Sequence, residues 1–542
     1  MRTVALKRNL FQRKQLFSTK STGGSKPSPG VSKTSQTIDF SDTKVAFASK
    51  TAGELFRAWC ILYGCSFGPL VKRADLLYNA SLTVLGSTLT HGVIERTLFR
   101  HFCAGKDEHD IVKPIKRLEE FGVGGILDYA AEAKDEELPA DVLVEGKLPL
   151  KSSAQARVHS YSSESKCDQN AEIFKHAVSA VHNVSPNGFA AVKLSALGEP
   201  ALLERMSIAL VEIESFFSKL SDNSSSSNTK LSFPQFLEGW KRFFNFSSND
   251  AVRAEFDLVD TDKDGVIDLV DWLGQLSLLH LPNLVSACKE EGALFRAALN
   301  EDELEQMKNL FRLCDEICQL AHEKKVRVMI DAEWTAIQPA IDTVVLEMQR
   351  KYNLASAAHP CIFGTYQTYL VGSQERVVRD LERANRENWK FGAKIVRGAY
   401  MVSERERAQR LRIASPIWPS YKVTEDNYHK TLALLIADPG TEVMVASHSE
   451  ATVKFVLQEV ERASKDASQI YFGQLMGMAD HLTFTLAAKK FQAYKYIPYG
   501  PVDEVMPYLI RRTQENSTLL GTPAVVQERK MLFSEFLRRL RP

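Results

Sequence analysis

The stretch YLIRRTQEN, from Tyr508 to Asn516, combines side chains that bind anions. At helical spacing one stripe carries a phenol, two guanidinium groups and a carboxylate, from Tyr508, Arg511, Arg512 and Glu515. Apolar residues just upstream follow the same period and predict the face that seats the helix, namely Val502, Val505, Met506 and Leu509. Two neighbouring arginines offer a planar, charge-assisted grip for a carboxylate. The alternative is a solvated charged face.

A second polar set lies in or just after short apolar runs. Its members are Lys193, Asp331, Lys394, Arg397, His448, Gln474 and Tyr496. Charge within runs such as IDAEW and AKIVRGAY is costly unless it is paired or used. A structural ion pair between Lys193 and Asp331 is the alternative for that couple, but a set of this size favours a site. No GxGxxG loop follows any of these runs.

The elements that would position these residues are eight β-rich runs alternating with helical segments. They cover 122–130, 189–197, 326–334, 360–370, 392–400, 442–449, 470–478 and 494–500. This alternation predicts an α/β fold, a distorted (β/α)8 TIM-like barrel. Chemistry in such barrels sits at the carboxyl ends of the strands, where the polar set falls.

The rest of the chain divides by composition. Residues 1–38 hold eight Lys or Arg and no acidic residue, which predicts a mitochondrial transit peptide, or else a disordered basic tail. We expect a helical region over 39–121, barrel over 122–217 and 301–525, an insertion over 218–300 and a C-terminal helix over 526–542. A net charge of +1 argues against nucleic acid, and the cysteine spacing indicates reduced thiols. No run is long enough to span a membrane; segment 58–71 comes closest, as core or as a membrane-surface element.

The insertion contains DTDKDGVIDLVD, an EF-hand-like loop. The ligand positions are Asp260, Asp262, Asp264, the carbonyl of Val266, Asp268 and Asp271, with Gly265 at the turn. The last position normally carries Glu, so the shorter Asp predicts weaker Ca²⁺ binding or a preference for Mg²⁺. The upstream segment SFPQFLEGWKRFF could be a helix of a degenerate partner hand. An acidic turn that binds nothing is the alternative.

Seven ordered motifs carry a resemblance to a known family. KLSAL, IDAEW, VRGAYMVSERERA, VASHSE, YFGQLMGMAD, YKYIPYG and YLIRRTQENS together resemble proline dehydrogenase, over about residues 122–520. The resemblance implies FAD on the open end of the barrel and oxidation of L-proline to Δ1-pyrroline-5-carboxylate, with hydride passing from proline C5 to flavin N5. It further implies that the electrons reach ubiquinone and that the enzyme lies on the matrix side of the mitochondrial inner membrane.

The resemblance also assigns roles. Arg511 and Arg512 match the arginines that bind the substrate carboxylate, with Tyr508 against the ring; Glu515 would orient the pair, from its spacing. Lys193 would lie near the substrate, and Asp331 would hold it by a hydrogen bond. Lys394 matches the cation beside flavin N5, where bacterial enzymes have Arg. The residues matched to the cofactor are Ala332, Arg397, Gly398, Ala399, Ser447 and His448.

Three alternatives remain at this point. The first is a hydroxyproline dehydrogenase of the same family. It is disfavoured because such enzymes resemble this stretch but carry a small Ser at the position of Tyr496, where proline-specific members carry Tyr. A barrel aldolase would use Lys193 or Lys394 as a Schiff base and bind no flavin. A calcium-sensing adaptor with an inactive barrel is disfavoured by the intact set of site residues.

Overall fold

The computed structural model describes residues 38–71, 73–130, 156–220, 230–275, 278, 281–290, 292–519 and 523–541. Residues Phe40–Pro542 form one compact unit. The predicted transit peptide falls almost wholly on residues 1–37, outside the described residues, and stays a prediction.

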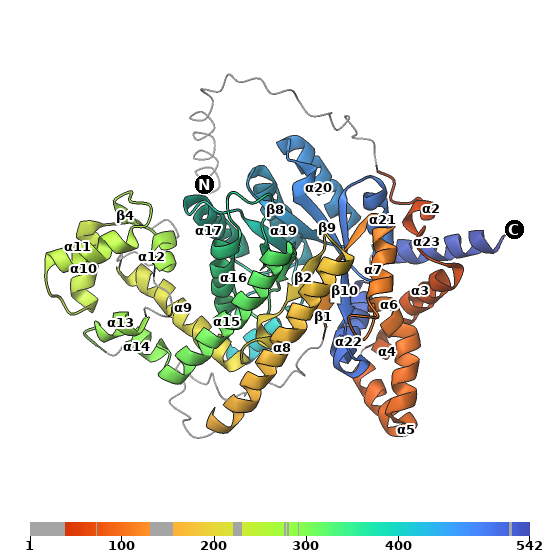
Figure 1. The fold of residues 1–542 in the computed structure, drawn as a ribbon, viewed down its shortest axis with the longest axis horizontal. Helices are drawn as coiled ribbons and strands as arrows, with labels where there is room; N and C mark the ends of the chain where they lie inside the picture. Colours follow the sequence, from red (N-terminus) through yellow and green to blue (C-terminus); the bar gives the residue numbers. More distant parts are fainter. Residues whose placement is uncertain are drawn as a thin grey trace, which may run out of the picture. The chain divides into compact units, whose positions relative to one another are not determined.

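Eight strands close into a parallel barrel in the order β1-β10-β9-β8-β7-β6-β5-β2, and the barrel prediction is confirmed (Figure 1). The strands are β1 (Val123–Tyr129), β2 (Phe189–Val192), β5 (Arg327–Ile330), β6 (Ile362–Gln367), β7 (Gly392–Val396), β8 (Glu442–Ala446), β9 (Ile470–Leu475) and β10 (Gln492–Tyr499). Each falls on one of the β-rich runs of the sequence. Most end a few residues earlier than the runs, so the polar residues that follow lie in loops at the barrel mouth.

The barrel interior is a packed layer below those loops. Phe189 lies at its centre, with its ring edge-on to Phe363, Tyr471 and Tyr494 at centroid distances of 5.3 to 5.5 Å. Such edge-to-face contacts are favourable arrangements of aromatic rings. The layer closes the barrel as a solid core, so the open end is the place where ligands can bind.

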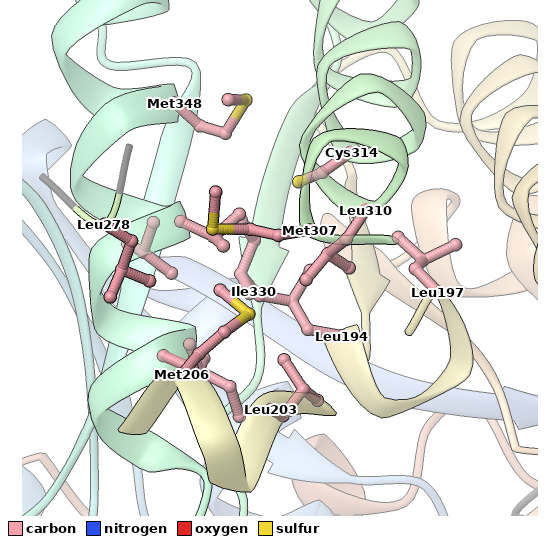
Figure 2. Close-up of a cluster of buried hydrophobic side chains, with 14 of the residues drawn as sticks. Leu194, Leu197, Leu203, Met206, Leu278, Met307, Leu310, Cys314, Ile330 and Met348 are labelled. Carbon is pink, nitrogen blue, oxygen red and sulfur yellow. The ribbon is translucent and has the colours of Figure 1, made fainter. Parts of the chain in front are cut away.

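Helices flank this barrel along the chain. Between and after the strands lie α8 (Ala156–Val184), α9 (Pro200–Leu220), α15 (Glu301–Lys324), α16 (Gln338–Tyr352), α17 (Ser373–Arg386), α18 (Met401–Leu411), α19 (Tyr421–Ala437), α20 (Glu450–Ala463), α21 (Asp480–Ala488), α22 (Val502–Leu519) and α23 (Pro523–Leu540). Short 3-10 turns cover Leu194–Ala196 and Ala467–Gln469. Figure 2 shows the apolar contact between wall and helices, where Leu194 and Ile330 meet Met206 of α9 and Leu310 of α15.

The predicted N-terminal helical region is confirmed. It comprises α2 (Thr43–Ala46), α3 (Ala52–Gly64), α4 (Gly68–Val71), α5 (Ala74–Ile94), a π-helical turn (Glu95–Phe99), α6 (Arg100–Phe102) and α7 (Val112–Glu119). Thr51 and Glu54 form a capping box at the start of α3, which fixes where that helix begins. Helix α23 packs on α3 through Leu55, Leu62 and Leu532, so the two ends of the compact unit hold each other.

Between α9 and α15 the chain forms a small helical module. Its elements are β3 (Leu231–Ser232), α10 (Phe233–Phe243), α11 (Asn249–Val259), β4 (Val266–Ile267), α12 (Leu269–Gln275), α13 (Leu281–Ser286) and α14 (Ala293–Ala297). Strands β3 and β4 pair antiparallel, with Leu231 opposite Ile267. The buried indole of Trp272 donates a 2.9 Å hydrogen bond to the Ile213 carbonyl of α9, which ties the module to the barrel.

The structure also describes the cysteines and the apolar segment 58–71. All eight cysteines lie among the described residues and all are free thiols, as predicted. Among the described helices none is long and apolar enough to cross a bilayer. Segment 58–71 is divided between the two interpretations given for it, because Ile61 and Leu62 are buried whereas Tyr63 and Phe67 are exposed.

Candidate active site at the barrel mouth

The centre of the mouth is a carboxylate held from two sides. Asp331 directly follows β5, and its backbone N–H still donates to the Val192 carbonyl of β2, which fixes its direction. Its Oδ1 lies 2.5 Å from Nζ of Lys394 on β7, and its Oδ2 accepts a 2.7 Å hydrogen bond from the hydroxyl of Tyr496 on β10. The Lys394 ammonium also lies 4.9 Å from the centre of the Tyr496 ring. Three predicted site residues from separate strands therefore form one unit.

Lys193 has a different partner from the one considered. Its Nζ lies 3.7 Å from Oδ1 of Asp128, a residue of β1 that is only 1% exposed. The alternative of an ion pair between Lys193 and Asp331 is therefore wrong, because Asp331 is taken by Lys394. The sequence reasoning missed Asp128. A signal was present, since Asp128 is the one charged residue in the apolar run GVGGILDYA.

Arg397 follows β7 and is locked in place. Its guanidinium donates to the hydroxyls of Ser447 at 3.0 Å and Thr452 at 2.9 Å, and it stacks 4.5 Å from the Tyr428 ring. Its Nε is buried without a hydrogen-bond partner. The sequence predicted Arg397 and Ser447 but not the two supporting side chains, whose helical positions gave no signal of their own.

The segment after Arg397 needs glycine. Gly398 has φ of +143°, and a Cβ there would lie 2.2 Å from the Tyr369 ring. Glycine accepts this backbone conformation and this close approach, which other residues do not. Ala399 is exposed next to it, and Ala332 is half-buried after β5 beside Asp331. These three positions carry only a methyl group or no side chain at all.

His448 follows β8 and is neutral. Its Nε2 accepts a 3.0 Å hydrogen bond from the Leu475 N–H, so the ring proton lies on Nδ1. Enclosure in the mouth, together with the nearby cations Lys495, Arg512 and Arg397, lowers the pKa of His448 to about 3. Gln474 is 1% exposed and uses both ends of its amide on Ser447 and Thr483, so its role is to support this wall.

Helix α22 brings the arginine stripe to the same place. Tyr508 and Arg512 are 4% and 8% exposed, and the Arg512 guanidinium lies 5.1 Å from the Tyr508 ring. A solvated charged face is therefore wrong for these two residues. Arg511 is half-buried beside them. The backbone of Glu515 belongs to α22, but its side chain lies outside the described residues, so its role stays a prediction.

The loop of the inserted module gathers part of its predicted ligand set. Carboxylate oxygens of Asp260, Asp262 and Asp264 lie within 4.8 Å of one another. Gly265 adopts φ of +83° at the turn, as its position requires. Asp268 and Asp271 are directed instead toward Arg386 of α17 and toward the loop's own backbone. Val266 uses its N–H on Asp264.

Comparison with known proteins decides the family. Residues 111–522 match the sequence profile of proline dehydrogenase. The chain belongs to the proline dehydrogenase family. The match spans all eight strands and helix α22, so the barrel mouth and its arginine stripe both lie within the part of the chain that defines proline dehydrogenases.

The relatives of this chain include proline dehydrogenases and, at lower identity, hydroxyproline dehydrogenases. Mitochondrial proline dehydrogenase 1 of Caenorhabditis elegans is 35% identical over 93% of this chain and 88% of its own length, and that of Drosophila melanogaster is 36% identical over 95% and 83%. Human hydroxyproline dehydrogenase is 28% identical over 92% and 93%. Among solved structures, proline utilization A from Bdellovibrio bacteriovorus, inactivated by N-propargylglycine, shares the fold with a TM-score of 0.52 and 16% identity, over 93% of this chain and 41% of that longer chain.

The mouth fits a dinucleotide cofactor by the chemistry of its side chains. The cations are Lys193, Lys394, Arg397, Arg511 and Arg512, and the carboxylates paired with them are Asp128, Asp331 and Glu425. Lysine and arginine side chains of this kind suit the pyrophosphate of FAD and a substrate carboxylate. The buried, unpartnered Nε of Arg397 is a further donor at this wall.

Proposed function

We propose that this protein is an FAD-dependent proline dehydrogenase that oxidises L-proline to Δ1-pyrroline-5-carboxylate. One observation carries the proposal: the carboxylate of Asp331, held by Lys394 and Tyr496, lies at the same mouth as buried Tyr508 and Arg512 of helix α22. An amino acid with a secondary amine needs both, a carboxylate partner for the nitrogen and cations for its own carboxylate.

In this proposal the chain's own side chains place the substrate. Arg511 and Arg512 grip the carboxylate of proline, and Tyr508 packs against its ring. Asp331, fixed by Lys394 and Tyr496, accepts a hydrogen bond from the amine and so orients the ring. Lys193, held by Asp128, adds positive charge beside the substrate. Positioning of this kind is the main contribution that a protein makes to hydride transfer.

The residues that would hold FAD are Arg397, Ser447 and His448 by their side chains, with Ala332, Gly398 and Ala399 contributing backbone contacts. FAD supplies the two-electron acceptor for the hydride from proline C5. The ammonium of Lys394 would supply a positive charge that stabilises a reduced, anionic cofactor.

The contacts at the mouth also favour a proline dehydrogenase over a hydroxyproline dehydrogenase and over an aldolase. Tyr496 fills the space beside Asp331 with a full ring, which disfavours a hydroxylated substrate, and proline dehydrogenases are the more similar relatives. Both candidate Schiff-base lysines form ion pairs with carboxylates. Both amines are thus engaged by carboxylates, and the chain belongs to a dehydrogenase family, so an aldolase is disfavoured.

We further propose that electrons pass to ubiquinone at the mitochondrial inner membrane, on the matrix side. Helix α5 exposes a row of apolar side chains, with Leu76, Val84 and Leu89 each more than 60% exposed, and it packs against α22, the helix over the mouth. Exposed apolar patches of this kind mark interaction surfaces, and a lipid surface would give access to a lipid-soluble quinone. The mitochondrial names of the relatives and the basic N-terminal segment support this location.

A divalent cation, Ca²⁺ or Mg²⁺, is proposed for the module's loop. Asp260 is 4% exposed, and its Oδ1 has no hydrogen-bond partner although the neighbouring carboxylates of Asp262 and Asp264 are close. A buried carboxylate oxygen without a donor is costly unless a cation completes it.

The visible spectrum of the purified protein, before and after anaerobic proline, tests the main proposal. We expect a flavin band that proline bleaches and that hydroxyproline bleaches much less well. A flavin band that ignores proline would overturn the substrate assignment. A colourless protein that stays inactive with added FAD would overturn the flavin dehydrogenase altogether.

A further inference from the structure

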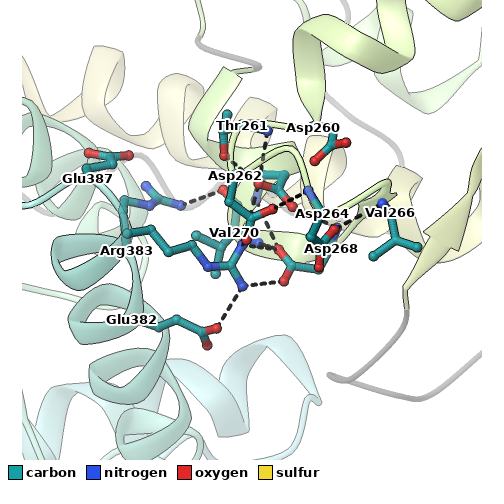
Figure 3. A network of polar contacts seen from close by, with 12 residues as sticks. Asp260, Thr261, Asp262, Asp264, Val266, Asp268, Val270, Glu382, Arg383 and Glu387 are labelled. Carbon is teal, nitrogen blue, oxygen red and sulfur yellow. Dashed lines mark hydrogen bonds and ion pairs between the residues drawn. The ribbon is translucent and has the colours of Figure 1, made fainter. Parts of the chain in front are cut away.

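Barrel helix α17 contacts the inserted module through Arg383 and Arg386, and Figure 3 shows Arg383 directed toward the module near Val270. Arg383 donates to the Val270 carbonyl of α12 at 3.5 Å, while Arg379, one turn earlier, pairs with Glu214 of the barrel helix α9 at 3.2 Å. Arg386, the last residue of α17, goes further and enters the acidic loop itself. The contact between barrel and module is therefore partly a contact with the proposed cation site.

The guanidinium of Arg386 is shared among several loop carboxylates. It lies 2.5 Å from Asp268, 3.3 Å from Asp262 and 3.4 Å from Asp271. Glu382, one turn earlier in α17, holds it at 2.7 Å from the other side. The planar fork of an arginine can serve several oxygens at once, and here it does so inside a loop whose sequence is rich in acid.

These contacts coincide with ligand positions. Asp262, Asp268 and Asp271 are the third, ninth and twelfth positions of the loop, and each faces Arg386. Lys230 likewise holds Asp264 at 2.9 Å. Only the buried Oδ1 of Asp260 has no partner of its own among these carboxylates. Four of the five loop carboxylates are thus in contact with a side-chain cation, and one of the two cations, Arg386, belongs to the barrel.

We propose that Arg386 is a tethered cation that competes with a divalent ion for the loop. This rests on the divalent site proposed above and adds its regulation. A metal ion and a guanidinium cannot both take the oxygens of Asp262 and Asp268, and their like charges repel. Ion binding therefore requires Arg386 to leave, which breaks this link between α17 and the module and lowers the affinity of the wild-type loop.

The rearrangement is local. Trp272 of α12 remains bonded to Ile213 of α9, because this contact does not involve the loop carboxylates. The module therefore stays on the barrel while the loop and the end of α17 separate. Helix α17 leads directly into β7, the strand that carries Lys394, so the change occurs next to an element of the active site.

Calcium titrations of the FAD-loaded full-length protein test the competition. Isothermal calorimetry in metal-free buffer compares wild type with Arg386→Gln and with Arg253→Gln. Arg253 is a matched control: it lies on α11 beside the loop and pairs with Asp257, which is not a ligand. We expect Arg386→Gln to tighten Ca²⁺ binding about tenfold or more, the order expected for removing a charged competitor. Arg253→Gln should change it less than about threefold, by long-range charge alone.

A second variant and a second readout guard against misfolding. Arg386→Lys keeps the charge but loses the fork, and we expect a smaller gain in affinity than for Gln. In wild type, Ca²⁺ should speed hydrogen exchange at backbone amides over 382–391, and in Arg386→Gln this response should be absent.

Three results would overturn the proposal. Equal Ca²⁺ affinity in wild type and Arg386→Gln, or weaker binding in the variant, would show that Arg386 supports the loop rather than competing for it. Absence of Ca²⁺ binding in every variant would remove the divalent site and the competition together. Bleaching of the flavin by proline is measured in the same samples, so failure of the loop proposals is distinguishable from failure of the dehydrogenase assignment.

Discussion

Replacing Tyr496 with phenylalanine removes one hydroxyl and leaves the ring where it is. The lost group is the donor of the 2.7 Å hydrogen bond to Oδ2 of Asp331, while Lys394 keeps its hold on Oδ1. The carboxylate that we propose to orient the amine of proline would then be fixed from one side only. Substrate binding would continue, but the reacting carbon would spend less time in the productive position.

The size of the effect follows from these contacts. A hydrogen bond to a charged group contributes about 1.5–3 kcal/mol. The side chain of Asp331 is 13% exposed, so water can partly replace the lost hydroxyl, and the lower end of that range applies. Since about 1.4 kcal/mol corresponds to a factor of ten, we expect kcat/KM for proline to fall about tenfold.

Anaerobic stopped-flow measurement of flavin bleaching by proline provides the rate. Tyr494→Phe is the matched control, because Tyr494 lies two residues earlier on β10 and its hydroxyl bonds to Asn187 at 3.2 Å, in the packed layer below the site. It should bleach at the wild-type rate. A Tyr496→Phe enzyme with kcat/KM within twofold of wild type would refute the role given to the Tyr496–Asp331 contact.

Burial, with the nearby Lys50, lowers the pKa of His101 from 6.5 to about 3. The unfolded chain therefore binds a proton at His101 that the folded one does not, and this histidine alone should lower the unfolding free energy by about 2 kcal/mol between pH 7 and 5; His101→Phe should remove this part of the drop in denaturant titrations, and the part from His448 should remain. Gly398→Ala should cost about 1–3 kcal/mol, by thermal melting, and lower the flavin-to-protein ratio, because its Cβ would meet Tyr369. Gly372→Ala, at φ of +82° with open space around it, should cost only about 1 kcal/mol and keep the flavin. Leu89→Glu, at an exposed position of α5, should leave the melting temperature unchanged but abolish co-sedimentation with anionic vesicles; unchanged sedimentation would remove α5 from the membrane surface.

The sequence predicted the barrel well because the alternation of eight apolar runs with helices leaves few other folds. The polar residues at the barrel mouth could be predicted together with the barrel, because parallel strands of a barrel all end at one face. The pairings among them could not be predicted. Which carboxylate reaches Lys193 depends on strand order and stagger, and the neighbour that reaches it, Asp128, lies on β1, beside β2 in the closed sheet.

Contacts between residues that are far apart in the chain are a second feature that the sequence could not predict. The contact between Arg386 and the loop joins two helical segments separated by the end of the insertion, two strands and two helices, and neither carries a periodic signal that predicts the other. The loop motif itself was visible, because ligand spacing is local. What the motif could not indicate is that the barrel supplies a cation to the same carboxylates.

The insertion also bears on how the barrel assembles. Strands β2 and β5 are hydrogen-bonded neighbours, yet β2 ends at Val192 and β5 begins at Arg327. Closing a long flexible loop costs entropy that grows slowly with its length, about 0.6 kcal/mol for each doubling. If the module folds first and docks on α9 through Trp272, the loop left to close is several times shorter, and the β2–β5 pairing becomes easier by about 1 kcal/mol. The module would then speed barrel folding, and a variant with a loosened module should refold more slowly while its unfolding rate changes little.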